Sequence, residues 1–327
     1  MATKVTLDDI RAAAGRLSGK AQETPLLSSA ALDARFGARV LFKAECLQRT
    51  GSFKFRGAYN CISLIPEEVR ARGVVACSSG NHAQGVAEAA RLFGIPATIV
   101  MPDDAPALKR ARTERSGARV VPYDRVREDR EAIARAIGEE TGATFIHPFE
   151  DPRVIAGQGT VGLEIVAQAA ALGVVPDAVL IPASGGGLLA GSGLALKAAL
   201  PDVAIYAVEP AGFDDHRRSL ASGAREHNEK LGGSISDALL AAAPGENTFA
   251  INRDQVAGGL AVSDDDALSA VGVAAEELKV VTEPGGAVGL GALLSGEAAF
   301  AGKTVVVVLS GGNIEPDMLA RAIGKDG

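Results

Sequence analysis

Clustered positive charge, cysteine and long apolar runs are all scarce in this sequence of 327 residues. No run of lysine and arginine exceeds two residues and the formal net charge is -7, so a nucleic-acid-binding surface is not expected. The three cysteines, Cys46, Cys61 and Cys77, show no CxxC spacing, and they predict neither a disulfide framework nor a zinc site. No apolar segment precedes the first charges, and no membrane span is recognised. We therefore expect a cytoplasmic protein without membrane partners.

What is present is a repeated pattern of short apolar runs and alanine-rich helical segments. The hydrophobic content of 47% is enough for a large core. Runs of β-branched residues without polar alternation are typical of strands buried on both faces, so the pattern predicts an α/β protein with mainly parallel sheets. Thr6 and Asp9 predict a capped first helix, and another helix is expected from about residue 54. The expected strands are residues 39–43, 73–77, 97–101, 118–121, 144–146, 178–181, 203–208 and 304–309.

Lys54 is the first candidate for chemistry. It lies between small and apolar residues, and Arg56 follows two positions later. Partial desolvation and a cationic neighbour would both lower the pKa of the amine and leave a nucleophile suited to Schiff-base formation. The expected helix N-terminus would lower that pKa further through its dipole. From these residues alone, the start of a solvated helix explains the pattern equally well.

Three clusters of serine, glycine and asparagine each follow an expected strand, at residues 78–82, 184–187 and 310–313. In open parallel sheets, ligands bind beyond the carboxyl ends of the strands. Residues 184–187 offer closely spaced backbone N–H groups at a helix start, which suits a phosphate, although an ordinary strand-to-helix turn has the same composition. A plain helix cap likewise explains residues 78–82.

Taken with Lys54, these clusters resemble the pyridoxal-phosphate (PLP) enzymes of the tryptophan-synthase-β fold, which is PLP fold type II, and within them the threonine/serine dehydratase and serine racemase family. The resemblance implies two α/β lobes, each a mainly parallel twisted sheet flanked by helices. The large lobe would comprise residues 1–69 and 150–327 and the small, inserted lobe residues 70–149. A homodimer is also expected.

The resemblance further assigns roles to individual residues. Lys54 would hold the cofactor and remove the proton from the substrate Cα, and Ser79 would face it from the other side. The cofactor would also contact Phe53, Asn81, Ser184, Gly185, Gly186, Gly187, Leu188 and Ser310. The substrate carboxylate would be bound by Ser78, Ser79, Gly80, Asn81 and His82.

Residues 209–215 form a fourth cluster, in which two carboxylates are separated by a turn. Hard oxygen ligands of this kind suit Mg²⁺ or Ca²⁺. The resemblance implies a metal site made of Glu209, the Phe213 carbonyl and Asp215. On spacing alone, a helix cap in front of Arg217 and Arg218 is the stronger interpretation. His147, His216 and His227 show no ligand spacing.

These observations favour an ammonia-lyase that converts L-threonine or L-serine to a 2-oxo acid and ammonia. A serine racemase would use the same residues. A 3-hydroxyaspartate ammonia-lyase would need an additional cation for the side-chain carboxylate, and Arg130 lies where the family can carry one, although a solvated helix face explains it more simply. A non-catalytic sensor would keep the same sheet and phosphate loop without the lysine chemistry.

Overall fold

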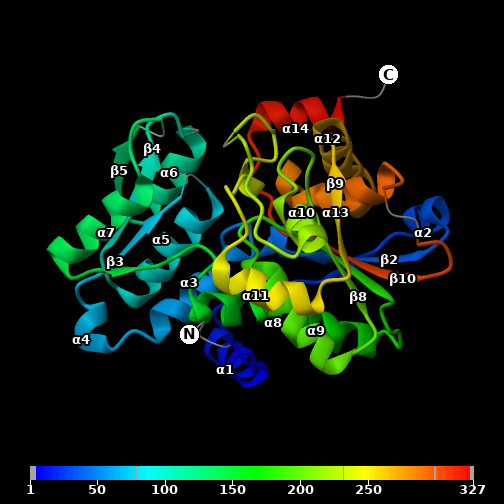
Figure 1. Ribbon diagram of the computed structural model, residues 1–327, viewed down its shortest axis with the longest axis horizontal. Coiled ribbons are helices and arrows are strands. Elements are labelled where there is room, and N and C mark those ends of the chain that lie inside the picture. The colour runs from blue at the N-terminus through cyan, green and yellow to red at the C-terminus, as the bar shows by residue number, and fades with distance from the viewer. Residues whose placement is uncertain are drawn as a thin grey trace.

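The computed structural model describes residues 5–78, 80–105, 107–124, 126–230, 232–297 and 300–324. Within these ranges the chain forms two sheets, each with helices packed against it (Figure 1). The sheet of six strands lies with the C-terminal half of the chain, and the sheet of four strands comes from the segment between residues 74 and 145. The expectation of an α/β fold with mainly parallel sheets is confirmed.

The larger sheet has the strand order β1-β2-β10-β7-β8-β9, and only the pair β1–β2 is antiparallel. Its central strand β10 carries the sequence TVVVVL and is buried from its second residue onward, because helices cover both faces of the sheet. The strands are β1 (Leu26–Ser28), β2 (Arg39–Ala44), β7 (Ala178–Pro182), β8 (Ala204–Pro210), β9 (Gly258–Val262) and β10 (Thr304–Leu309).

The smaller sheet has the order β5-β4-β3-β6 and is parallel throughout. Its core combines β-branched strand residues with the alanine-rich face of helix α5 (Asn81–Phe93). The strands are β3 (Val74–Cys77), β4 (Ala97–Pro102), β5 (Arg119–Tyr123) and β6 (Thr144–Phe145).

Thirteen further α-helices surround these sheets within the described ranges. Helix α1 begins with the expected capping box, in which the Thr6 hydroxyl accepts from the Asp9 N–H and the Asp9 carboxylate accepts from the Thr6 N–H. The bounds are α1 (Leu7–Leu17), α2 (Ala30–Phe36), α3 (Lys54–Ser63), α4 (Glu67–Arg70), α6 (Ala107–Arg115), α7 (Arg130–Thr141), α8 (Pro152–Ala171), α9 (Gly187–Ala199), α10 (Asp215–Ser222), α11 (Glu246–Gln255), α12 (Asp264–Val273), α13 (Pro284–Leu294) and α14 (Pro316–Ile323).

Helix α8 corrects the expectation that no apolar stretch is long enough to cross a membrane. Its 20 residues meet that criterion by length and composition. However, 61% of its most apolar window is buried inside the protein, where it packs against α1, α3 and α9. We therefore interpret α8 as a core helix.

All eight expected strands are present, and each of the three glycine clusters follows one of them, after β3, β7 and β10. Backbone hydrogen bonds tie the last of these clusters to the segment before α3: Phe53 N donates to Ser310 O at 3.2 Å and Gly312 N donates to Gly51 O at 2.8 Å. The start of α3 is therefore fixed against the carboxyl end of β10. This contact holds Lys54 at the edge of the larger sheet.

Candidate active site

A single cavity collects most of the predicted site residues. It opens where loops of the larger sheet meet α5, α6 and α7 beside the smaller sheet. Lys54 and the glycine-rich loop lie on one wall, and side chains of the smaller lobe lie on the other. Its lining includes Phe53, Lys54, Ser78, Gly80, Asn81, His82, Lys109, Arg130, Phe149, residues 184–188, Asp237 and Ser310.

Lys54 is the first residue of α3 and faces this cavity. Its Nζ donates a hydrogen bond to the Pro148 carbonyl at 3.0 Å and lies 5.1 Å from the centroid of the Phe53 ring. The surrounding protein desolvates the amine, and this burial lowers the pKa of Lys54 to about 8. A substantial fraction of the amine is therefore neutral near physiological pH, as a base or nucleophile requires.

Arg56 does not contribute to this shift as the sequence predicted. Its side chain is 1% exposed and points into a buried ion-pair network with Glu45 and Glu164, at 2.8 Å and 2.5 Å. Burial alone accounts for the lowered pKa of Lys54. The reason is geometric, because residues i and i+2 of a helix do not face each other.

The glycine-rich loop joins β7 to α9, so its backbone lies at a helix N-terminus that favours anions. Two of its glycines are required by close packing. A Cβ on Gly185 would lie 2.2 Å from the Phe149 ring, and a Cβ on Gly186, where φ is +90°, would lie 2.7 Å from His216 Nε2. The loop backbone is thus pressed between side chains, with Ser184, Gly185, Gly186, Gly187 and Leu188 all lining the cavity.

Asn81 begins α5 and forms a buried polar cluster with two residues of the other lobe. Its Nδ2 donates to Glu283 Oε1 at 2.5 Å, and its Oδ1 accepts from Asn313 Nδ2 at 2.7 Å. Glu283 is 2% exposed, and its Oε2 has no hydrogen-bond partner among the described residues. Burial raises the pKa of Glu283 to about 7. The sequence analysis missed this carboxyl group, because nothing in the run that precedes α13 indicates which loop it meets.

The rest of the serine-rich loop is only partly described. Ser78 Oγ accepts from Gly80 N at 3.1 Å, and Ser79 lies outside the described residues. His82 is 2% exposed, and its Nε2 lies 2.9 Å from the Ile146 carbonyl, so Nε2 carries the proton. Burial lowers the pKa of His82 to about 3, and the ring is therefore neutral. Its Nδ1 has no partner within the described part of the chain, which leaves an acceptor rather than a cation.

Two cationic side chains of the small lobe also line the cavity. Arg130, the first residue of α7, makes no hydrogen bond or ion pair within the ranges that the structure describes. Lys109 on α6 is 5% exposed and forms a close ion pair with Asp237, which belongs to the other lobe. Arg130 was predicted from the sequence. Lys109 and Asp237 were not, since an isolated charge on a polar helix resembles an ordinary solvated one.

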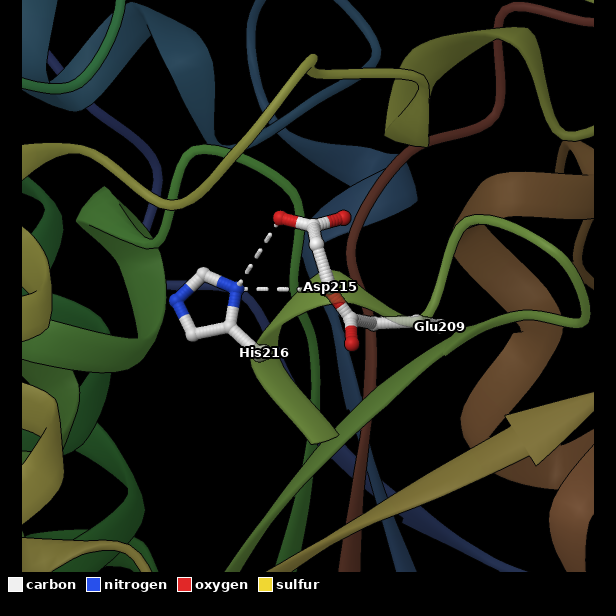
Figure 2. A group of neighbouring side chains, drawn as sticks. All are labelled: Glu209, Asp215 and His216. Atoms are coloured by element: carbon white, nitrogen blue, oxygen red, sulfur yellow. Dashed lines mark hydrogen bonds and ion pairs between the residues drawn. The ribbon is translucent and has the colours of Figure 1, made fainter. Parts of the chain in front are cut away.

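Glu209 and Asp215 lie together at the carboxyl end of β8 and the start of α10, and both are fully buried. Figure 2 shows the His216 ring facing both carboxylates, with Nδ1 3.3 Å from Glu209 Oε1 and 3.9 Å from Asp215 Oδ2. Burial and the charge of Glu209 raise the pKa of Asp215. Asp215 Oδ2 has no hydrogen-bond partner among the residues described. Part of the helix-cap interpretation also holds, because Glu209 Oε2 accepts from the Arg217 N–H at 3.2 Å.

The residues of the cavity fit PLP. A lysine amine with a lowered pKa, a glycine loop at a helix N-terminus and a hydroxyl at Ser310 line one space, and these are the groups that an aldehyde, a phosphate and a pyridine nitrogen need. A parallel α/β architecture with these groups at the carboxyl edge of the sheet defines a PLP-dependent enzyme of fold type II.

The chain belongs to the family described as "Pyridoxal-phosphate dependent enzyme", whose sequence model matches residues 17–311. It is 45% identical to L-threo-3-hydroxyaspartate ammonia-lyase from Pseudomonas sp over 95% of this chain and 96% of that protein. A threonine deaminase from the organism abbreviated T.th. superimposes with a TM-score of 0.90 at 45% identity, over 95% of this chain and 99% of that one. Maize serine racemase has a TM-score of 0.91 at 39% identity, over 99% and 98%.

Proposed function

We propose that this protein is an ammonia-lyase that converts an L-β-hydroxy amino acid with a second carboxylate, L-threo-3-hydroxyaspartate, to a 2-oxo acid and ammonia. The observation that carries this choice is Arg130, a guanidinium in the cavity of Lys54 with no protein partner in the described ranges. A planar guanidinium pairs with a carboxylate through two parallel hydrogen bonds. The similarity to the Pseudomonas sp hydroxyaspartate enzyme supports the same substrate.

Bound PLP would supply the electron sink for carbanion formation at the substrate Cα. Lys54 would hold the cofactor and accept the Cα proton, because burial keeps a neutral amine available near pH 8. The loop of residues 184–188 would bind the phosphate through its backbone N–H groups, and Ser310 would face the ring nitrogen. Ser78, Gly80, Asn81 and His82 would bind the α-carboxylate, His82 as a neutral side chain.

A divalent cation, Mg²⁺ or Ca²⁺, is the second part of the proposal. Its ligands would be Glu209, Asp215 and the carbonyl of Phe213, which are hard oxygen donors. The pairing of two buried carboxylates supports it, since ionising both without a counter-charge is unfavourable. A cation there would remove this penalty and satisfy Asp215 Oδ2.

Dehydration of L-serine or L-threonine is the second candidate. It is favoured by the apolar part of the cavity, where Phe149 and Leu239 could accept a methyl group. The similarity to the T.th. threonine deaminase points the same way. A monocarboxylic substrate would leave Arg130 without a carboxylate partner.

The test is a substrate panel with a matched pair of variants. Release of 2-oxo acid is measured for L-serine, L-threonine and L-threo-3-hydroxyaspartate with the wild type, Arg130→Ala and Arg127→Ala. Arg127 is the control because its side chain is 84% exposed and it does not line the cavity. Loss of one charge-assisted carboxylate contact of about 1.5–3 kcal/mol should lower kcat/KM for hydroxyaspartate about 10- to 100-fold in Arg130→Ala only.

The values for serine and threonine should change much less in Arg130→Ala. An equal loss for all three substrates would show that Arg130 does not recognise the side-chain carboxylate. Turnover of threonine without turnover of hydroxyaspartate by the wild type would establish the second candidate instead.

A further inference from the structure

The His216 ring lies directly between the two buried carboxylates and the glycine-rich loop. On one side its Nδ1 is 3.3 Å from Glu209 Oε1. On the other side its Nε2 is 3.3 Å from Asn252 Nδ2, and that amide also approaches Gly186 O at 3.4 Å. His216, Asn252 and Glu209 are all 0% exposed. One side chain therefore spans the distance from the carboxylates to the loop.

The hydrogen bonds of Asn252 fix the proton on the His216 ring. Gln255 Nε2 donates to Asn252 Oδ1 at 3.4 Å, so the other amide atom, Nδ2, faces the ring and Gly186. An amide NH₂ is a donor, and His216 Nε2 must accept from it. The proton then lies on Nδ1 and is donated to Glu209. In this tautomer His216 orients a carboxylate and is not itself a cation ligand.

The contact with the loop leaves no room for adjustment. Gly186 has φ +90°, and a Cβ there would lie 2.7 Å from His216 Nε2 and 2.8 Å from Asn252 Nδ2. The ring and the amide thus support the loop backbone from the side away from the cavity, where the same loop lines the Lys54 site. A shift of the ring would move the N–H groups that face the cofactor phosphate.

We infer that His216 and Asn252 are positioning residues that couple a divalent cation at Glu209 and Asp215 to the affinity of the glycine-rich loop for PLP. This inference rests on the cation site and the phosphate loop of the proposed function. A bound cation would fix the Glu209 carboxylate, Glu209 would fix the ring through Nδ1, and the ring would hold the loop through Nε2. Thermodynamic linkage then requires PLP to raise cation affinity by the same factor.

The experiment measures both affinities, with Mn²⁺ as the cation. PLP dissociation constants are obtained by equilibrium dialysis with and without Mn²⁺, and Mn²⁺ binding to the PLP-free and PLP-loaded proteins by electron paramagnetic resonance. The variants are His216→Asn and Asn252→Ala. In His216→Asn an amide can still donate to Glu209 but cannot reach Gly186, so it separates the two ends of the ring. His227→Asn is the control, because His227 is an exposed histidine of the same lobe.

In the wild type we expect Mn²⁺ to lower the PLP dissociation constant at least about fivefold, with the reciprocal effect of PLP on Mn²⁺. Both variants should still bind Mn²⁺ and PLP, with the coupling reduced to less than about twofold. His227→Asn should behave as the wild type. If His216→Asn does not fold, Asn252→Ala decides alone, since it leaves the carboxylates untouched.

Wild-type coupling in the folded variants would overturn the inference while leaving the cation site intact. Independent binding of Mn²⁺ and PLP to the wild type would overturn it as well. If Mn²⁺ does not bind to the wild type at all, both the proposed cation site and the coupling are wrong.

Discussion

Replacement of Glu283 by glutamine is expected to change how the stability of the protein depends on pH. Burial raises the pKa of Glu283 to about 7, against an ordinary value near 4.5. The folded protein therefore binds a proton more tightly than the unfolded chain. The stability that this proton provides is fully present below about pH 4.5 and is lost as the pH rises through about 7.

The difference between these two pKa values corresponds to roughly 3 kcal/mol, at about 1.4 kcal/mol for each pH unit. Glu283→Gln keeps a carbonyl oxygen to accept from Asn81 Nδ2 and cannot ionise. Relative to the wild type, the variant should therefore gain about 2–3 kcal/mol of unfolding free energy between about pH 5 and about pH 8.

The assay is urea unfolding of both proteins after removal of PLP with hydroxylamine. The difference between variant and wild type cancels the titration of groups that they share, including Asp215. A difference that stays constant with pH would refute the reasoning, because it would show that Glu283 ionises in the folded protein at no cost.

Three further predictions concern single side chains. Lys54→Ala should remove covalent attachment of PLP, measured by borohydride reduction and peptide mapping, and labelling of another lysine in the wild type would contradict this. Ser79→Ala should retain measurable dehydration of L-serine or L-threonine but lose racemisation and turnover of D-isomers, assayed by chiral chromatography; unchanged D-serine formation would mean that another group acts on the second face. Arg56→Met should cost about 3–5 kcal/mol in urea unfolding, because it leaves Glu45 and Glu164 buried without their cation, and a cost below about 1 kcal/mol would show that these carboxylates do not need it.

The fold could be predicted from the sequence wherever a strand is central and buried. Strands such as β10 are continuous apolar runs, and their identity does not depend on their partners. The two missed strands lie at the edges of the larger sheet. β1 has three half-buried or exposed residues, and β9 begins with Gly258 and Gly259 and is buried only at Val262. Edge strands of this kind are defined by the neighbour that pairs with them, which local sequence does not reveal.

The site could be predicted where a motif follows a strand, because the carboxyl ends of parallel strands place such motifs at a common edge. Lys54, Asn81, residues 184–188 and Ser310 were found in this way, and they line one cavity. Contacts between residues far apart in sequence could not be found. Asn81 bonds Glu283 across 202 positions, and Lys109 pairs with Asp237 across 128. The direction of Arg56 was also misjudged, because sequence proximity to Lys54 was taken for spatial proximity.

These long-range pairs have a consequence for the chemistry of Lys54. Asn81 bonds Glu283 and Asn313, Arg112 bonds Asn313 at 2.8 Å, and Lys109 pairs with Asp237, so the small lobe is fastened to the large one around the cavity. The lowered pKa of Lys54 is due to burial alone. Separation of the lobes would hydrate the amine and return its pKa toward the ordinary value of lysine, near about 10.4. The ability of Lys54 to act as a base near neutral pH therefore depends on contacts made by other residues across the cavity.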